Sequence, residues 1–349
     1  MSLPCRASEY LSMTARLPGP GARMAIRKVA REVLSHVLGA RKGDRLLVIT
    51  DEHRIEIGNA FYEAADALEL EGKLFVLEDS ERPLEEVPPE LGRALSGAGI
   101  VLTLFVAYEE ETPFRVKLLA AAQQAGARVG HGPGITDDMM REGAMHADFK
   151  VLLEHAEALM RRLAGAERAR LRGPGGTDLR LGIAGRRWVS DVVVEPGKYG
   201  NLPPGELWVA PVEDQADGTF VCDLELHDTG PVPTPISFEL SAGRVVSVRS
   251  EDPKLTERVN GMLSIDDQAR VVGELGVGIN EAARITGNML EDGKRAGMVR
   301  LALGNNEDIP GGANRSLTHM DLLLREPTLT VEAKGGRTRT IVDKGELVE

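Results

Sequence analysis

Hydrophobic residues in the first half of the chain alternate between helical stripes and short continuous runs. From Ala25 to Leu38 they recur at intervals of three and four residues, which predicts a helix that ends at Gly39. The run DRLLVITD, residues 44–51, is apolar through its centre, as is typical of a strand buried on both faces. This rhythm continues to about residue 165. We therefore expect an α/β domain with an open parallel sheet over residues 25–165.

The pattern changes in LRGPGGTDLRLGIAGRRWVSD, residues 171–191. From there, short strands interrupted by Gly and Pro replace the alternation of strands and helices. Segments such as ELWVAPVE and GTFVCDLELHD predict strands, SAGR is typical of a hairpin loop, and helical stretches are expected near residues 253–270. The second half, residues 166–349, is therefore predicted to be an α+β domain rich in antiparallel strands.

Length and composition fit this division into two domains. The chain has 349 residues, more than one hydrophobic core usually organises. Residues 1–24 lack the apolar centre of a secretion signal, so we expect a disordered leader there, with folded structure starting near Met24. No apolar run approaches the roughly 18 residues of a membrane span. The sequence therefore predicts a soluble protein of two domains.

Charge and cysteine content indicate which kinds of partner the protein binds and in which cellular compartment we expect it. The formal net charge is −12, and no cluster of Lys and Arg stands beside aromatic residues, which argues against a nucleic-acid surface. The two cysteines, Cys5 and Cys222, have no paired spacing that predicts a disulfide framework or a thiolate metal site. We expect a cytoplasmic protein that binds a small or peptidic ligand.

The stretch LTHMDLLL, residues 317–324, places polar groups in a run that otherwise predicts a buried strand. His319 and Asp321 are two residues apart, so their side chains point to the same face. A carboxylate on an apolar strand is costly unless it is paired or binds a cation. The two residues either satisfy each other at a wet strand end or bind one ligand together.

Three more charged residues stand where the second half is otherwise apolar. Glu206 follows a Pro-Pro-Gly break and enters an apolar strand, Glu274 lies in the Gly-flanked run VVGELGVGIN, and Arg300 lies on MVRLALG. Together with His319 and Asp321, the two glutamates form a ligand set suited to Zn²⁺, Mn²⁺, Co²⁺ or Fe²⁺. The residues alone leave a second interpretation open, which is a buried ion-pair network with Arg300 as its cation. His227, near a turn in ELHDTG, is expected to be solvated.

Five stretches in the second half, in order, resemble the aminopeptidase T family of metallopeptidases, also described as leucyl aminopeptidase-like. They are GTDLRLGIAGR, GNLPPGELWVAPVE, GELGVGINEAARITGNMLEDGK, LALG and THMDLLL, and they span about residues 177–330. The resemblance implies a pair of divalent metal ions, Zn²⁺, Co²⁺ or Mn²⁺ rather than Fe²⁺, held by Glu206, Glu274, His319 and Asp321. Such ions polarise a peptide carbonyl and activate water. The resemblance also implies a homodimer that acts on small peptides or amino-acid-like substrates.

The sequence departs from the family pattern at three places. Arg300 stands where family members have a histidine ligand, and a guanidinium cannot bind a metal because it offers only donors. No tyrosine follows the ALG turn, where the peptidases have a catalytic one, and Gly293 replaces an acid in EDGK. We therefore expect an altered and impaired site, in which Glu206 and Arg300 are the candidate catalytic residues and Arg300 either orients substrate or blocks the second metal.

Three alternatives follow from these departures. A single metal could be held by Glu274, His319 and Asp321, with Glu206 behind them. The scaffold also resembles that of ring-cleaving 2,5-dihydroxypyridine dioxygenases, which use one Fe²⁺ held by two histidines and a carboxylate, but Glu274 stands in place of one histidine. A third alternative is a non-catalytic binding protein in which Arg300 replaces the charge of the second metal and binds a ligand carboxylate.

Overall fold

The computed structural model describes residues 20–227 and 229–348. Its contacts divide the chain into two compact units, one with residues up to 146 and 193–202, the other with residues 147–192 and 203 onward. We predicted a boundary near residue 165; the contacts place residues 147–165 with the second unit and return residues 193–202 to the first. The predicted leader lies mostly outside the described residues, and Met24 is already inside a helix. Within the described ranges, no helix combines the length and apolar character needed to cross a membrane.

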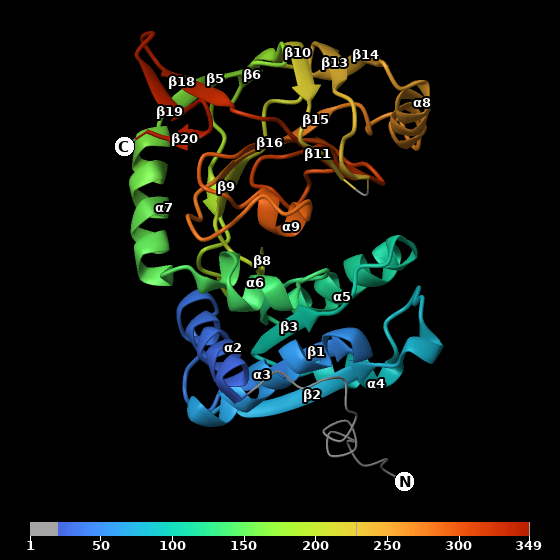
Figure 1. Ribbon diagram of the computed structural model, residues 1–349, viewed down its shortest axis with the longest axis vertical. Coiled ribbons are helices and arrows are strands. Elements are labelled where there is room, and N and C mark those ends of the chain that lie inside the picture. Colours follow the sequence, from blue (N-terminus) through green and yellow to red (C-terminus); the bar gives the residue numbers. More distant parts are fainter. Residues whose placement is uncertain (1–19, 228, 349) are drawn as a thin grey trace. The chain divides into compact units, whose positions relative to one another are not determined.

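The first unit is built on a parallel sheet with the strand order β2-β1-β3-β4-β8 (Figure 1). Its strands are β1 (Arg45–Asp51), β2 (Glu71–Leu77), β3 (Ile100–Leu104), β4 (Arg128–His131) and β8 (Tyr199–Asn201). Its helices are α2 (Pro20–Glu32), continued by a π-helical turn (Val33–Val37), α3 (Ile55–Ala67), α4 (Pro89–Leu95), α5 (Thr112–Gln124) and α6 (Asp137–Arg141). The predicted α/β domain with an open parallel sheet is confirmed.

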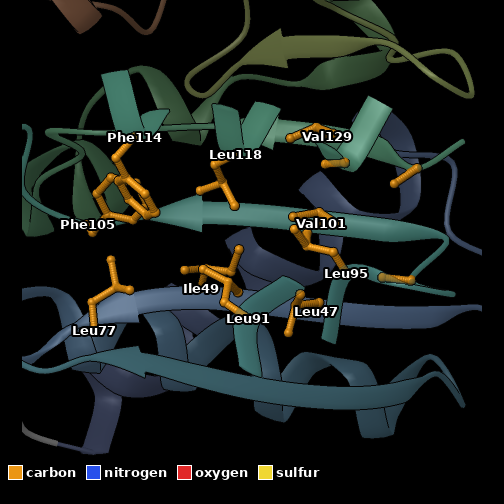
Figure 2. Close-up of a cluster of buried hydrophobic side chains, with 13 residues drawn as sticks. Leu47, Ile49, Leu77, Leu91, Leu95, Val101, Phe105, Phe114, Leu118 and Val129 are labelled. Atoms are coloured by element: carbon orange, nitrogen blue, oxygen red, sulfur yellow. The ribbon is translucent and has the colours of Figure 1, made fainter. Parts of the chain in front are cut away.

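Continuous apolar runs become the central strands because both faces of the sheet are covered. Strands β1 and β3 are buried along almost their whole length. Figure 2 shows one side of this core, where Phe114 of α5 lies beside Phe105, Leu118 of α5 points toward β3, and Leu91 of α4 lies near Ile49 of β1. Burial of each large apolar side chain in this way stabilises the folded state by roughly 1.5–3 kcal/mol.

The second unit contains two antiparallel sheets and three helices in its described part (Figure 1). One sheet has the order β14-β13-β10-β6-β5-β18-β19-β20, with strands at Arg244–Ser250, Ile236–Ser241, Ala216–Cys222, Asp178–Gly182, Ala166–Arg172, Thr328–Ala333, Thr338–Asp343 and Glu346–Leu347. The other has the order β12-β11-β17-β16-β15-β9-β7, with strands at Gly230–Pro231, Glu225–Leu226, His319–Leu323, Val299–Gly304, Val272–Gly278, Glu206–Val209 and Val189–Ser190. The helices are α7 (Phe149–Leu163), α8 (Pro253–Met262) and α9 (Met289–Asp292). The predicted α+β half rich in antiparallel strands is confirmed.

Candidate active site

The predicted site residues lie on one face of the second sheet of the second unit. Residues directly opposite each other in antiparallel strands point to the same face, and residues two apart along a strand share that face. Glu274 of β15 is opposite Ala302 of β16, which is opposite Asp321 of β17. Arg300 and His319 lie two residues from Ala302 and Asp321. The register of three strands therefore brings these charged residues together.

Small residues give this face the room that the charged groups need. Glu206 of β9 is opposite Gly278, and Gly276 is opposite Arg300. A β-carbon placed on Gly276 would come within 2.4 Å of the Glu206 Oε1 atom and 3.4 Å of the Arg300 Nε atom. Gly276 is thus required where a carboxylate and a guanidinium meet above the strand.

Arg300 lies at the centre of the site and contacts three carboxylates. Its Nε atom is 3.0 Å from Oε1 of Glu206, its Nη1 atom is 3.3 Å from Oδ1 of Asp321, and its Nη2 atom donates a hydrogen bond to Oε1 of Glu274. The Arg300 side chain is 10% exposed, and the three carboxylates are less exposed still. A charge so deeply buried is stable only because its partners are charged too.

Lys294 supplies a second buried cation behind Glu206. Its Nζ atom is 2.6 Å from Oε2 of Glu206 and 2.9 Å from Oδ2 of Asp191. The other oxygen of Asp191 accepts hydrogen bonds from the backbone N–H groups of Gly205 and Glu206, and so fixes the start of β9. The sequence reasoning missed Asp191, because its only signal was an acid directly after the short strand of RRWVSD.

His319 is the most exposed of the predicted ligands. Its Nδ1 atom is 2.8 Å from the carbonyl oxygen of Asn305, so an Nδ1–H group donates there and directs Nε2 toward the carboxylates. Nε2 is 3.3 Å from Oδ1 of Asp321 and 3.8 Å from Oε2 of Glu274. Burial alone would lower the pKa of His319, but the Asp321 and Glu274 charges raise it to about 9. The imidazole is therefore protonated near neutral pH.

His227 also reaches the site, although we expected it to be solvated. Its Nδ1 atom is 3.4 Å from Oδ2 of Asp321, and its backbone N–H donates to the Asp321 carbonyl oxygen. Burial alone would raise the pKa of Asp321, but the Arg300 and His319 charges hold it well below its usual range. Asp321 thus lies between two imidazoles and a guanidinium, an arrangement that the turn motif ELHDTG did not reveal.

A pair of divalent ions does not fit the site as its side chains lie. The positions between the carboxylates are taken by the Arg300 guanidinium and the Lys294 ammonium. Within residues 20–227 and 229–348, no group of three or more His, Cys, Asp or Glu side chains is arranged to hold a metal ion. Glu206 Oε1, Arg300 Nε and Asp321 Oδ1 are buried and make ion pairs but no hydrogen bond of good geometry. The arrangement is the ion-pair network around Arg300 that the residues alone left open.

Comparison with known proteins identifies the family. A model of the thermophilic metalloprotease (M29) family matches residues 140–347, well over half of the chain, and the chain therefore belongs to this family. Aminopeptidase T from Thermus thermophilus is 26% identical over 180 residues, which cover 46% of this chain and 43% of that protein. The match thus spans less than half the length of this curated relative. The predicted resemblance to the aminopeptidase T family is confirmed.

Two solved structures share the fold of nearly the whole chain. The 2,5-dihydroxypyridine dioxygenase from Pseudomonas putida KT2440 matches with a TM-score of 0.72 at 19% identity, covering 93% of this chain and 97% of that one. Wild-type aminopeptidase T from Thermus thermophilus matches with a TM-score of 0.70 at 18% identity, covering 94% and 100%. At this identity the two structures establish the architecture, and the chemistry has to be argued from the site.

Proposed function

We propose that this chain is an aminopeptidase-like hydrolase of small peptides that uses one divalent metal ion instead of two. The M29 family implies dependence on a divalent metal, and the likeness to aminopeptidase T supports a peptidase. The observation that carries the proposal is the charge of the site. Four carboxylates, from Asp191, Glu206, Glu274 and Asp321, face only two permanent cations, Lys294 and Arg300. Once His319 has lost its proton, these groups carry two more negative than positive charges, which one divalent ion would balance.

His319, Asp321 and Glu274 would hold this ion after their side chains rearrange, because as they lie in the described residues they are not arranged around a metal position. Imidazole nitrogen and carboxylate oxygen suit Zn²⁺, Mn²⁺ or Co²⁺, and the ion would displace the proton that His319 carries. The backbone carbonyl that accepts from Nδ1 holds the imidazole in the tautomer that metal-binding histidines use. A bound divalent ion supplies a Lewis acid and lowers the pKa of water at the site to near neutral.

The other groups of the site position these residues and the substrate. Arg300 and Lys294 hold Glu206 in place, so Glu206 acts as a positioning residue. His227, which is 34% exposed beside Asp321, is the group best placed to move a proton to or from a bound peptide. The likeness to aminopeptidase T supports a short peptide with a free amino terminus as the substrate. As parts of the same proposal, the protein acts as a cytoplasmic homodimer, and neither nucleic acid nor membrane is its partner.

A second candidate function is the binding of a small ligand without hydrolysis. The position of Arg300 favours it, because a guanidinium between three carboxylates neutralises them without any metal. The dioxygenase is not carried forward, since the likeness is one of fold and Glu274 stands where the resemblance places a histidine.

Peptide hydrolysis by metal-free and reloaded protein tests the proposal. We expect the chain to release the amino-terminal residue from di- and tripeptides after addition of Zn²⁺, Mn²⁺ or Co²⁺, and to lose activity at least about 100-fold in His319→Ala or Asp321→Asn. Arg168→Ala is the matched control, because the Arg168 side chain is 74% exposed on the other sheet. Calorimetric binding of the same peptides without hydrolysis under every metal condition would establish the binding function instead.

A further inference from the structure

We infer that Arg300, supported by Lys294 on the other side of Glu206, is a permanent replacement for one metal ion of the family pair, so that the site assembles without metal and accepts at most one ion. The inference deepens the proposed function and rests on it for the single ion that remains, but it does not depend on hydrolysis. It follows from the disagreement between the two ions that the resemblance implies and the guanidinium that stands where the family has a histidine ligand.

The two cations share one carboxylate. Oε1 of Glu206 faces Arg300 at 3.0 Å, and Oε2 faces Lys294 at 2.6 Å. Both oxygens are thus engaged by groups that are covalently part of the chain. Glu206 is fully buried, and an ionised carboxylate there is stable only next to positive charge. Since both oxygens of Glu206 already face a cation of the chain, a metal ion could bind Glu206 only by displacing Arg300 or Lys294.

Each cation also engages carboxylates on its other side. Lys294 contacts Asp191, which is fixed by two backbone N–H groups, and Arg300 contacts Glu274 and Asp321. The two cations therefore bridge carboxylates from the two sides of Glu206, as shared metal ions do. Removing Arg300 would leave Glu274 and Asp321 facing only imidazole groups, and removing Lys294 would leave Asp191 with only its two backbone N–H donors.

The backbone is shaped to deliver the Lys294 ammonium. A β-carbon on Gly278 would lie 2.3 Å from the carbonyl oxygen of Arg295 and 2.7 Å from that of Gly293, so the end of β15 packs directly on this turn. The backbone N–H of Asn280 donates to the carbonyl oxygen of Lys294 at 2.9 Å. These contacts fix the backbone around Lys294, so the position of its ammonium group beside Glu206 is set by the fold.

Metal content of the full chain tests the inference. We would purify the protein without chelators, incubate it with excess Zn²⁺ or Mn²⁺, remove free ions and count bound ions by elemental analysis. We expect no more than one ion per chain, and one additional ion in Arg300→His, which restores the imidazole that the family has at this position. Arg168→His is the control, since it creates an imidazole on an exposed strand; it should leave the count unchanged.

The outcomes separate this inference from the proposed function. Two ions in the unchanged protein, or no gain in a folded Arg300→His, would overturn the replacement of a metal by Arg300. Zero ions in the unchanged protein with a gain in Arg300→His would uphold it while removing the metal-dependent hydrolase. If Arg300→His fails to fold, thermal unfolding of the unchanged protein decides: equal melting temperatures with and without EDTA support assembly without metal, and a clear fall in EDTA contradicts it.

Discussion

Each unit contains an arginine buried between carboxylates, but the two clusters differ in how fully their polar atoms are hydrogen-bonded. In the first unit Arg82 lies between Asp51 and Glu111, and all three side chains are at most 2% exposed. In the second unit Arg300 lies between Glu206, Glu274 and Asp321.

The first cluster is saturated with hydrogen bonds. Asp51 accepts from the backbone N–H groups of Arg54 at 2.8 Å and Val106 at 2.7 Å, and Glu111 accepts from Leu84 N–H at 3.0 Å. Arg82 also donates to the Val106 carbonyl oxygen, and its guanidinium carbon lies 4.3 Å from the centre of the Tyr108 ring. Backbone N–H groups and the guanidinium together satisfy all four carboxylate oxygens, so this cluster has the properties of a structural site at the end of the sheet where α/β folds often bind ligands.

The second cluster leaves buried atoms without hydrogen bonds. Glu206 Oε1, Arg300 Nε and Asp321 Oδ1 are among those atoms. Buried polar atoms of this kind are costly and are retained where a ligand or a reaction uses them. The comparison teaches that a buried arginine is structural or functional according to how completely its neighbours are satisfied.

The largest effect is expected from Arg82→Ala. The substitution leaves two buried carboxylates without a cation and should lower the free energy of unfolding by about 3–5 kcal/mol. Urea denaturation with and without Zn²⁺ or Mn²⁺ measures it. Divalent ions should not restore stability, because backbone N–H groups already occupy three of the four carboxylate oxygens and only Oε2 of Glu111 loses its partner; recovery with metal would contradict the structural role.

Arg300→Ala is expected to cause a smaller loss of stability, which a divalent metal ion reverses. The site is partly open at His319, so we expect a cost of about 1–3 kcal/mol in the free energy of unfolding. A divalent ion at about 100 times its dissociation constant should return roughly 2.7 kcal/mol, because the freed carboxylates can now bind it. The same denaturation series with Arg168→Ala gives the baseline. An equal effect of metal on the stability of the two variants, Arg82→Ala and Arg300→Ala, would contradict the distinction between the clusters.

The smallest expected effects are on the pH dependence of stability. Two histidines, one in each unit, should change it in opposite directions. Burial lowers the pKa of His131, at the end of β4, to about 3, while the pKa of His319 is raised to about 9. Relative to an unfolded value near 6.5, His131 contributes stability that is lost as pH falls from 6.5 toward 3. His319 contributes stability that is lost as pH rises from 6.5 toward 9.

Imidazole NMR titration of the metal-free protein checks this pair. The two signals are assigned from His131→Gln and His319→Gln. His131 should remain neutral through pH 5, and His319 should still be protonated at pH 7.5. A normal midpoint near 6.5 for His319 would mean that Arg300 already satisfies Asp321 and Glu274.

Much of the fold could be read from the sequence because it depends on short-range patterns. Continuous apolar runs such as residues 44–51 predicted the parallel strands, and alternation with Gly and Pro predicted the antiparallel half. The candidate site residues Glu206, Glu274, His319 and Asp321 could be selected because charge in an apolar strand is rare and because ordered motifs resemble the M29 family. The return of residues 193–202 to the first unit gave no such signal, since β8 is only three residues long.

By itself, the sequence determined the two kinds of sheet, the family and the set of polar groups that share one sheet face, because side-chain periodicity follows directly from residue order. Only the tertiary structure decided what those groups do to one another. Asp191, Lys294 and Glu206 meet at hydrogen-bond distance although up to 103 residues separate them along the chain. The interaction between charges depends on distances of a few ångströms and on burial, and neither quantity is contained in spacing along the chain.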